Sequence, residues 1–391
     1  MTESFLPKID GIVTMLTKTV ECLRQKGDEV LIFAPSGGPS ELFGAEVAAI
    51  PSVPFPMYPE LRLAPPRARM RMKLKEFRPD ILHLFEPALL GVGGLYYSEV
   101  FDIPLVISYH TNLPSYVHYY HLGVIEKLTW KLMRERHRRA DLNLCTSTVM
   151  IRDLDNHGIK NLALWERAVD ANRFRPETRS QAMRDRLMNG QSAGPLLLYV
   201  GRLSAEKDIP RLRAVIDALP GTRLAIVGDG PLRHTLERHF KGTATFFSGY
   251  LTGEALASAY ASADLFVLPS ETETLGLVLL EAMASGCPVV ACRAGGVPEA
   301  VQDGLTGFLF ERADTKGLIN AVQRALSSRC DLDAICVRAR QDVEQRTWEL
   351  ATAKLREYYV ETIANHPSKQ PRGPRSLTKR IILSMLRTFL P

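Results

Sequence analysis

The chain has 391 residues, of which 46% are hydrophobic and 24% charged, with a formal net charge of +6. This length exceeds the roughly 250–300 residues at which one hydrophobic core stops growing, so it predicts two domains. The composition excludes a disordered or fibrous chain. No apolar run reaches the roughly 18 residues that a membrane-spanning helix needs. The positive charge favours phosphates, anionic sugars or an anionic membrane surface as partners, although many globular enzymes are equally basic.

Six cysteines are scattered along the chain, at Cys22, Cys145, Cys287, Cys292, Cys330 and Cys336. None forms a C-x-x-C pair, and no histidine stands at the spacing of a zinc site. This pattern is typical of reduced, small core residues in a cytoplasmic protein.

The first half of the chain alternates predicted strands and helices. A loop over residues 1–11 leads directly into a helix with the apolar face Ile12, Leu16, Val20 and Leu23. Strand-like runs follow at 29–34, 80–84, 104–108 and 141–145. This alternation predicts a mostly parallel sheet covered on both faces. In such a doubly wound sheet the first strand is central, but here only the loop that should follow it is present. We therefore expect that the first strand is missing from this chain and that the natural start lies several codons upstream.

A second alternating pattern begins near Pro195. Its strand-like runs are 196–200, 224–227, 245–247, 265–268, 289–291 and 308–310. A linker near 169–179 separates the two patterns. We expect an N-terminal acceptor and sugar-side domain over 1–170 and a C-terminal domain over 171–345. Helices over 346–366 should pack back toward the N-terminal domain, ahead of a basic amphipathic tail over 367–391.

The stretch PSETETLGLVLLEAMASG, residues 269–286, follows one of these strands. It begins as a polar turn and should become helical from about Gly276 until Gly286. A helix N-terminus that follows a parallel strand binds anions in many α/β proteins. Glu281 falls in the apolar stripe of this helix, where a carboxylate is costly unless a polar group meets it. That group could be a ligand or a neighbouring backbone group or arginine, and the pattern leaves both open.

Other turns at the ends of predicted strands carry polar or glycine residues. Arg202 and Lys207 follow the strand at 196–200 and can converge on one anion such as a diphosphate. Gly228 and Gly230 follow the next strand and allow a ligand to approach the backbone closely. In the first half, His110 stands where the strand at 104–108 ends, which makes it a candidate for ligand contact.

Three basic elements favour an anionic membrane surface. They cover residues 62–78, 127–139 and 376–391, and each mixes Lys or Arg with large apolar residues. Solvated helix faces and a disordered or docked tail are the alternatives. Nucleic acid is disfavoured because no binding motif accompanies the charge.

Segments spread along the chain resemble a known family. GRLSAEK, VGDGPLR, ADLFVLPSETETLGLVLLEAMASGCPVVACRAGGVPEAV and DGLTGFLF, in this order, resemble the retaining glycosyltransferases of family 4. These enzymes have the GT-B fold, an α/β fold with two facing Rossmann-like domains. Glu273 and Glu281 match the Glu-x7-Glu pair of that family. IDGIV, FPMYPELRLAPP, SYHTNLPSYVHYYHLG, DLNLCTST and ALWERAVD are similar to its cyanobacterial sulfoquinovosyltransferases.

The resemblance implies a function and assigns roles to residues. Sulfoquinovose would pass from UDP-sulfoquinovose to diacylglycerol, on the cytoplasmic face of a membrane, in sulfolipid biosynthesis. The implied catalytic residues are His110, Arg202, Lys207 and Glu273. The implied nucleotide-sugar-binding residues are Gly11, Arg202, Lys207, Gly228, Gly230, Glu273, Thr274, Leu275, Gly276 and Glu281. The candidates for the sulfonate are Lys8, His110, Tyr116 and His118.

Within these roles, Glu281 would meet the ribose hydroxyls and Glu273 the transferred sugar. No Asp-x-Asp metal site is evident, so we expect no required cofactor, with Mg²⁺ assistance left open. One alternative is a UDP- or GDP-hexose-dependent glucosyl or mannosyl transferase that acts on a lipid. Another is a non-catalytic nucleotide-sugar-binding membrane protein, which would be expected to have lost its charged site residues. A dehydrogenase is disfavoured because no G-x-G-x-x-G turn follows an opening strand.

Overall fold

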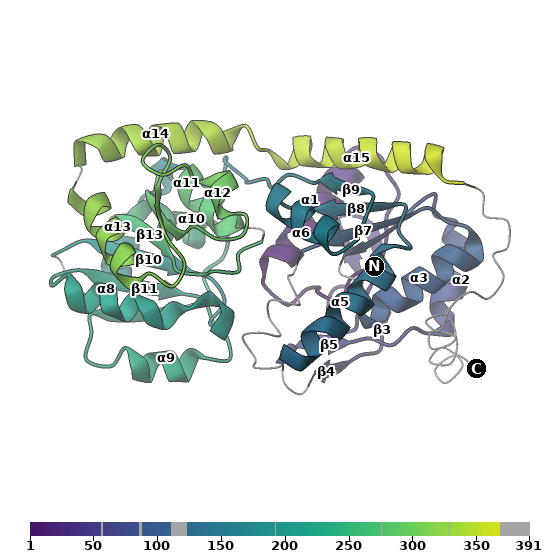
Figure 1. Cartoon of the computed structure of the whole chain (residues 1–391), viewed down its shortest axis with the longest axis horizontal. Coiled ribbons are helices and arrows are strands. Elements are labelled where there is room, and N and C mark those ends of the chain that lie inside the picture. Colours follow the sequence, from purple (N-terminus) through teal and green to yellow (C-terminus); the bar gives the residue numbers. More distant parts are fainter. Residues whose placement is uncertain are drawn as a thin grey trace. The chain divides into compact units, whose positions relative to one another are not determined.

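The computed structural model describes residues 1–55, 58–85, 88–110, 123–191, 193–274, 276–327 and 329–367. Two compact units are present (Figure 1). Unit 1 contains Met1–Trp165 and, among the described residues, the segment 348–367, and unit 2 contains Glu166–Thr347. These contact boundaries fall five residues before the expected boundary at 170 and two after that at 345.

Unit 1 is an α/β unit with short strands. Its helices are α1 (Gly11–Gln25), α2 (Ala68–Phe77), α3 (Leu89–Phe101), α5 (Gly123–His137), α6 (Thr148–Asn156) and α15 (Trp348–Asn365). Its strands are β1 (Leu31–Pro35), β2 (Glu41–Leu42), β3 (Ala45–Ile50), β4 (Val53–Phe55), β5 (Tyr58–Leu63), β6 (Leu82–Phe85), β7 (Leu105–Tyr109), β8 (Leu142–Cys145) and β9 (Leu162–Leu164). Helix α15 is continuous and packs on α1, and its Arg356 forms an ion pair at 2.7 Å with Asp28, which follows α1.

The strands of unit 1 form two separate parallel arrangements. β6, β7, β8 and β9 lie side by side in that order, and β1 pairs in parallel with β3, which also pairs with the short β2. β4 and β5 form an antiparallel pair. The sequence patterns missed β2 to β5 and β9, because β2 to β5 are interrupted by Glu or Pro and β9 has only three residues, so none is a clear apolar run.

Unit 2 is a doubly wound domain. Its strands are β10 (Leu196–Val200), β11 (Arg223–Val227), β12 (Thr245–Gly249), β13 (Leu265–Leu268), β14 (Val289–Cys292) and β15 (Phe308–Phe310). Its α-helices are α7 (Gln181–Leu187), α8 (Leu212–Ala218), α9 (Arg233–His239), α10 (Gly253–Ser262), α11 (Leu277–Ala284), α12 (Val297–Ala300), α13 (Thr315–Ser327) and α14 (Arg329–Glu344). Short 3₁₀ turns occupy Pro176–Thr178, Ala205–Lys207 and Ile209–Arg211.

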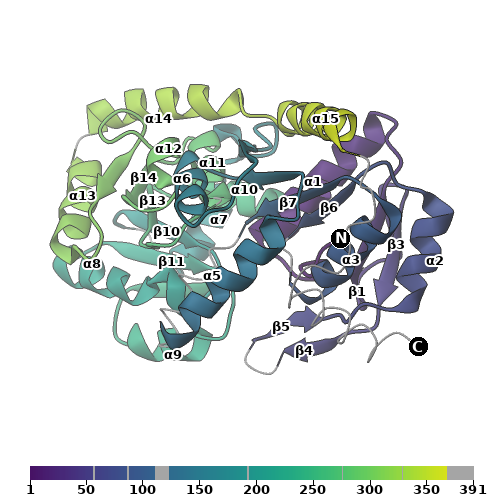
Figure 2. The same ribbon diagram turned by 45° about the vertical axis from the view of Figure 1, so that its right-hand side comes forward.

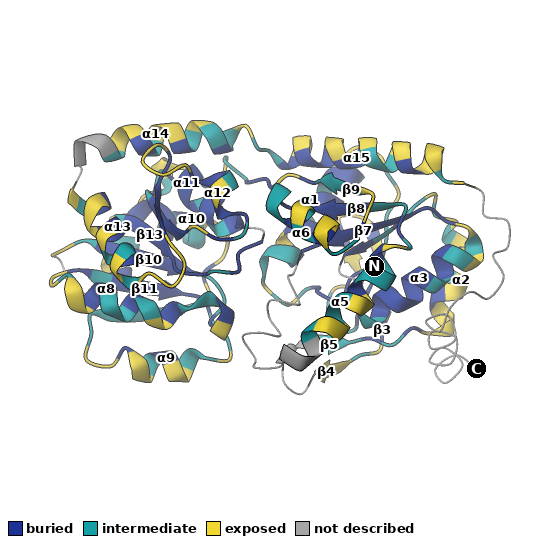
Figure 3. Ribbon diagram, viewed as in Figure 1, coloured by how far each residue is buried: buried dark blue, intermediate teal, exposed yellow. Residues whose placement is uncertain are grey.

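The sheet of unit 2 is parallel throughout, in the order β12-β11-β10-β13-β14-β15. Figure 2 shows helices on both faces of these strands. Most strand residues are buried, because helices cover both faces, and they appear dark blue in Figure 3. The order reverses between β10 and β13, and ligands of doubly wound sheets bind at the carboxyl ends of the strands beside such a switch point.

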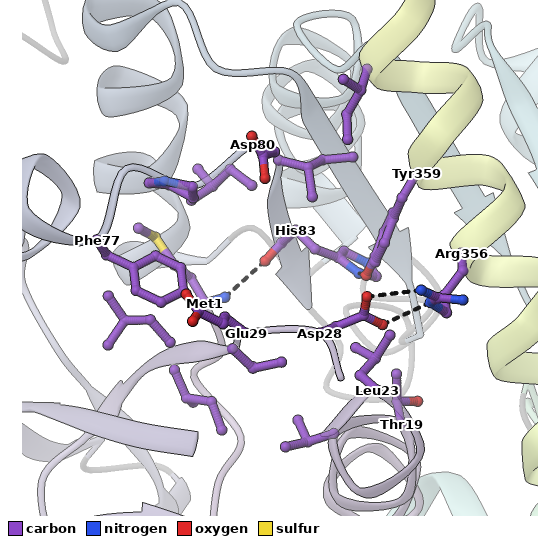
Figure 4. Close-up of a pocket in the computed structure, with 18 of the residues that line it drawn as sticks. Met1, Thr19, Leu23, Asp28, Glu29, Phe77, Asp80, His83, Arg356 and Tyr359 are labelled. Carbon is purple, nitrogen blue, oxygen red and sulfur yellow. Dashed lines mark hydrogen bonds and ion pairs between the residues drawn. The ribbon is translucent and has the colours of Figure 1, made fainter. Parts of the chain in front are cut away.

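The first residues of unit 1 lie between β1 and β6. The amide of Thr2 donates to the carbonyl of Phe33, and the amide of Phe85 donates to the carbonyl of Met1. Beyond Met1, a cavity of about 1000 Å³ separates the two strands (Figure 4). The loop over residues 3–10 then leads to α1, whose first turn is capped by the carboxylate of Asp10.

Candidate functional site

Three loops of unit 2 follow the adjacent strands β11, β10 and β13. They cover residues 228–230, 201–207 and 269–276, and the last two stand on either side of the switch point. Arg202, Lys207, Glu273 and Gly276 therefore come from one edge of one sheet. Most of the residues that the motifs single out in the second half lie on these loops.

Lys207 and Glu273 form a mostly buried ion pair at the start of α11, with 18% and 11% of their side chains exposed. The Lys207 Nζ atom lies 2.8 Å from Glu273 Oε2, and the Gly276 amide donates to Glu273 Oε1 at 3.1 Å. Burial alone would raise the pKa of Glu273, but the charge of Lys207 and these hydrogen bonds lower it overall. Burial would likewise lower the pKa of Lys207, but Glu273 raises it overall. Both groups are therefore charged near neutral pH.

The start of α11 has the character of an anion site. Gly276 is the N-cap residue, with a φ of 60° that favours glycine. Helix N-termini attract negative charge through their unpaired amides and the helix dipole. In the structure the carboxylate of Glu273 accepts a hydrogen bond from one of these amides, that of Gly276. Thr274 is buried beside it, and Leu275 lies outside the described residues.

Arg202 follows β10 on the same loop as Lys207. Its carbonyl accepts a hydrogen bond from the hydroxyl of Tyr199, a fully buried residue of β10, at 3.1 Å. This bond fixes the loop backbone at Arg202, and the Arg202 side chain remains partly exposed.

Gly228 and Gly230 bring two loops of the chain into contact. A Cβ atom on Gly228 would lie 2.0 Å from the carbonyl oxygen of Gly201, and one on Gly230 would lie 2.6 Å from that of Leu203. The Leu203 amide donates to Asp229 across this contact at 3.0 Å. In the structure these two glycines thus allow their own loop to approach the loop that carries Arg202.

Arg167 is a residue that the sequence patterns missed. It is buried, and its Nη2 atom donates to the carbonyl of Gly296 at 3.0 Å. A Cβ atom on Gly276 would lie 3.5 Å from its Nη1 atom, so the guanidinium stands beside the start of α11. Burial lowers its pKa, while the carboxylates of Glu299 and Glu273 raise it. Only its position in ALWERAVD, within a segment matched by resemblance, could have drawn attention to it.

Glu281 is half-buried rather than enclosed in the core. The hydroxyl of Tyr260, on α10, donates to its Oε2 atom at 2.9 Å. Burial raises the pKa of Glu281 to about 7, although this hydrogen bond and Arg173 lower it. The expected apolar stripe is otherwise present, because Leu277, Leu280 and Ala284 are buried. The carboxylate thus accepts a hydrogen bond from a tyrosine hydroxyl and also feels the charge of Arg173.

In unit 1, His110 directly follows β7 and is buried. Its Nε2 atom lies 2.7 Å from Ser108 Oγ, and its ring stacks on Phe85 with 5.3 Å between centroids. Burial lowers the pKa of His110 to about 4, against a smaller opposing effect of Asp10. The imidazole is therefore neutral at pH 7 and can donate or accept a hydrogen bond.

The loop that carries Lys8 lies near His110. Lys8 Nζ lies 2.6 Å from Asp10 Oδ2, and Asp10 is the residue whose charge acts on His110. Gly11 begins α1 directly after Asp10. Unit 1 therefore brings Lys8, Gly11 and His110 into one region at the carboxyl end of its parallel strands. Tyr116 and His118 lie outside the described residues.

Two features are absent from the described residues. No group of three or more His, Cys, Asp or Glu side chains in this part of the chain is placed to hold a metal ion. None of its helices is both long and apolar enough to cross a membrane.

Family comparisons match both halves of the chain. Residues 9–173 match the family described as "Glycosyltransferase Family 4", and residues 194–328 match "Glycosyl transferases group 1". Among solved structures, sucrose-phosphate synthase from Thermosynechococcus elongatus superposes with a TM-score of 0.76 at 22% identity, over 91% of this chain and 94% of that one. Anabaena HepE in complex with UDP and glucose gives 0.75 at 19%, over 92% and 98%. At these identities the structures show a shared GT-B fold of two Rossmann-like domains.

Sequence relatives are closer. A sulfoquinovosyl transferase of Arabidopsis thaliana is 40% identical, over 89% of this chain and 70% of the relative. A GDP-mannose-dependent alpha-mannosyltransferase of Mycolicibacterium smegmatis is 36% identical, over 91% and 95%. An alpha-monoglucosyldiacylglycerol synthase of Streptococcus pneumoniae is 25% identical, over 100% and 91%. These matches, together with the charged loops at the switch point of unit 2, show that the chain belongs to the glycosyltransferases of family 4.

Proposed function

We propose that this glycosyltransferase moves sulfoquinovose from UDP-sulfoquinovose to diacylglycerol, with retention of configuration at the sugar. The observation that carries the proposal is the 40% identity to the Arabidopsis sulfoquinovosyl transferase over most of the chain. The intact charged set Arg202, Lys207, Glu273 and Glu281 argues for catalysis and against a silent binding protein.

In this proposal unit 2 binds the nucleotide and the leaving diphosphate. Arg202, Lys207 and the amides at residues 274–276 bind the phosphate oxygens, on which negative charge develops as the glycosidic bond breaks. Lys207 lies at the start of α11, where its ion pair with Glu273 holds it. Glu281 accepts from the ribose hydroxyls, and Glu273 from hydroxyls of the transferred sugar. The loop at Gly228 and Gly230 supports the nucleotide.

The reaction itself is a substitution on one face of the sugar. The acceptor hydroxyl oxygen forms a bond to the anomeric carbon while the bond from that carbon to the diphosphate oxygen breaks. The hydroxyl proton passes to the leaving phosphate, so no protein nucleophile is needed. We further propose that metal is not strictly required, and abolition of activity by a chelator would contradict this.

We assign contacts with the sugar to Lys8, Gly11 and His110 of unit 1. Neutral His110 donates to a sugar oxygen, and Lys8, which is paired with Asp10, contacts the sulfonate at C6. Tyr116 and His118 remain further sulfonate candidates from the sequence. If Lys8→Ala left the preference for the sulfonated donor unchanged, Lys8 would be removed from this role.

The acceptor proposal places the enzyme at a membrane surface on its cytoplasmic side. On α5, Leu128 and Leu132 are 53% and 43% exposed, and Lys127 and Lys131 beside them are exposed as well. An apolar pair flanked by cations suits an anionic bilayer. In the element at 62–78, Lys73 pairs with Glu46. The element at 376–391 lies outside the described residues.

A transferase of glucose or mannose to a lipid is the second candidate. It is favoured by the 36% identity to the GDP-mannose-dependent enzyme and by the match to the glucosyldiacylglycerol synthase. The two candidates share the phosphate-binding residues and differ only in the sugar and base contacts.

Purified protein should therefore be incubated with diacylglycerol vesicles in three parallel reactions, which contain UDP-sulfoquinovose, UDP-glucose or GDP-mannose as the donor. We expect a sulfolipid only with the first donor. Glu273→Gln, prepared in the same way, serves as the inactive control. Glucose or mannose transfer without sulfoquinovose transfer would replace the first candidate by the second.

A further inference from the structure

A second ion pair joins the same two segments of unit 2 as the pair of Lys207 and Glu273. Arg211 Nη1 lies 2.9 Å from Glu271 Oε1, with 13% of the arginine side chain and 16% of the glutamate side chain exposed. Both pairs connect the segment between β10 and α8, residues 201–211, to the loop after β13. We call Lys207 with Glu273 the first pair and Arg211 with Glu271 the second pair.

The hydrogen-bond partners alternate along the loop after β13. The hydroxyls of Ser270 and Thr272 both donate to the carbonyl of Glu206, at 3.3 and 3.2 Å. Glu271 and Glu273, the residues that follow each of them, pair with the two cations. Alternation of this kind is that of an extended chain, in which every second side chain points to the same side. Residues 270–273 are therefore all bonded to the segment after β10.

The Glu271 carboxylate also holds the loop after β15. The amide of Ala313 donates to Glu271 Oε1 at 2.8 Å, and Arg312 Nε lies 3.5 Å from Oε2. Arg211 is in turn placed by Asp208, whose Oδ2 atom accepts from its Nη1 atom at 3.0 Å. Segments that follow β10, β13 and β15 therefore meet at one carboxylate, at the carboxyl edge of the unit 2 sheet.

The two pairs differ in their relation to the start of α11. Glu273 accepts from the Gly276 amide, so the first pair lies where an anion would bind. The charges of a bound diphosphate would attract Lys207 away from Glu273. Neither Arg211 nor Glu271 is among the groups assigned to the donor. The second pair can therefore stay intact while the first pair exchanges its partner.

We propose that Arg211 and Glu271 are positioning residues of the donor site, an inference that rests on the function proposed above for unit 2. The second pair keeps the loop after β13 in place when the diphosphate takes Lys207 from Glu273. Without the second pair, part of the binding free energy would be spent on ordering this loop. Loss of the second pair should therefore weaken nucleotide binding, although neither residue touches the nucleotide.

The test compares two substitutions in the second pair with a control at the opposite edge of the same sheet. Arg211→Met and Glu271→Gln each remove the ion pair and keep a side chain of similar length. Arg184→Met removes the control pair, in which Arg184 Nη2 lies 2.7 Å from Asp264 Oδ2. Asp264 precedes β13 and also accepts from the amide of Leu196 in β10. The control pair therefore joins the same two strands, but at their amino ends.

We expect Arg211→Met and Glu271→Gln each to weaken the binding of UDP to the full chain by about tenfold or more, as measured by calorimetry on the folded variants. The double variant should lose no more affinity than either single variant, because both residues act through one contact. Arg184→Met should bind UDP as the wild-type chain does. Unchanged affinity in Arg211→Met, or an equal loss in Arg184→Met, would overturn the positioning role.

Hydrogen exchange of the Gly276 amide separates this inference from the proposed function, because it needs no nucleotide. Arg211→Met should speed exchange of this amide by about tenfold or more, since the loop that carries its acceptor Glu273 is held less firmly. Arg184→Met should leave the exchange rate unchanged. An unchanged rate in Arg211→Met would overturn the positioning role, whatever the chain binds. Absence of UDP binding by the wild-type chain would overturn the proposed function instead, and the exchange rates would still decide whether the second pair holds the loop.

Discussion

Lys207 and Glu273 are bonded at 2.8 Å across the switch point of the unit 2 sheet, one from the loop after β10 and one from the loop after β13. Two buried charges are costly to desolvate, and their attraction often only offsets that cost. A pair of this kind is therefore weak evidence for stability. The pair lies at a helix N-terminus, where a bound anion can replace the Glu273 carboxylate as the partner of Lys207. This position fits a role in donor binding better than a role in stability.

Replacing Lys207 by Met should leave the Glu273 carboxylate buried without its cation. We expect a loss of about 3–5 kcal/mol in the free energy of unfolding, as for other broken buried pairs. The double variant Lys207→Met with Glu273→Gln should regain most of this stability, because no charge is left behind. Urea unfolding measures both. Both variants should lack transferase activity. Recovery of activity in the double variant would contradict a direct role for the pair.

The contact between the loops at 201–203 and 228–230 predicts a strong effect at Gly228. An Ala Cβ there would meet the Gly201 carbonyl at 2.0 Å, at a φ of 134° that side chains rarely adopt. We expect Gly228→Ala to cost about 3 kcal/mol or more, since both strain and overpacking contribute.

Gly242→Ala is the matched control for this substitution. Gly242 also has a positive φ, of 82°, but no atom lies within 4 Å of its added Cβ. It should cost only about 1–2 kcal/mol. Similar losses at the two positions would show that the loop contact is unimportant.

The raised pKa of Glu281 predicts a pH effect on stability. The carboxyl titrates at about 7 in the folded protein, against an ordinary value of 4.5. The folded state thus binds the proton more tightly, so this contribution is present below pH 4.5 and is lost as the pH rises to 7. Glu281→Gln should make the midpoint of thermal unfolding depend less on pH between these two values. An unchanged dependence of the midpoint on pH would show that a group other than Glu281 titrates in this range.

His110 should act in the opposite direction along the pH scale. Its pKa falls from 6.5 to about 4 on folding. Its stabilising contribution is therefore present above pH 6.5 and is lost as the pH falls toward 4. His110→Gln, which keeps a neutral hydrogen-bonding group, should remove this loss. Transferase activity of the variant, measured at pH 7.5 as a separate readout, should fall by about 10²-fold or more if His110 donates to the sugar.

The exposed patch on α5 predicts reversible membrane binding. Leu128→Ser with Leu132→Ser should weaken cosedimentation with vesicles of anionic lipid, because less apolar surface enters the interface. Val337→Ser on α14, where the side chain is 56% exposed, is the control and should change nothing. Raised salt should weaken binding of the wild-type chain. Equal cosedimentation of the double variant and the control would exclude α5 as the docking element.

Much of unit 2 could be predicted from sequence. β10, β13 and β15 begin and end at the expected residues, because each is a short apolar run between polar turns. The motifs also placed Arg202, Lys207 and Glu273 at the ends of neighbouring strands, since every parallel strand delivers its following loop to the same sheet edge.

Unit 1 was harder to predict because Glu or Pro interrupts its strands β2 to β5, and because, among the described residues, its two sheet portions meet at Met1 and Thr2. Local sequence thus determined the apolar strands, the turns that follow them and the residues that carry charge. Tertiary packing alone decided that Lys207 meets Glu273, that Tyr260 meets Glu281 and that Arg167 stands beside the start of α11. These partners lie 66, 21 and about 110 residues apart, so no local pattern records them. They meet because burial of the apolar strands and helices packs the elements and loops that carry them against one another.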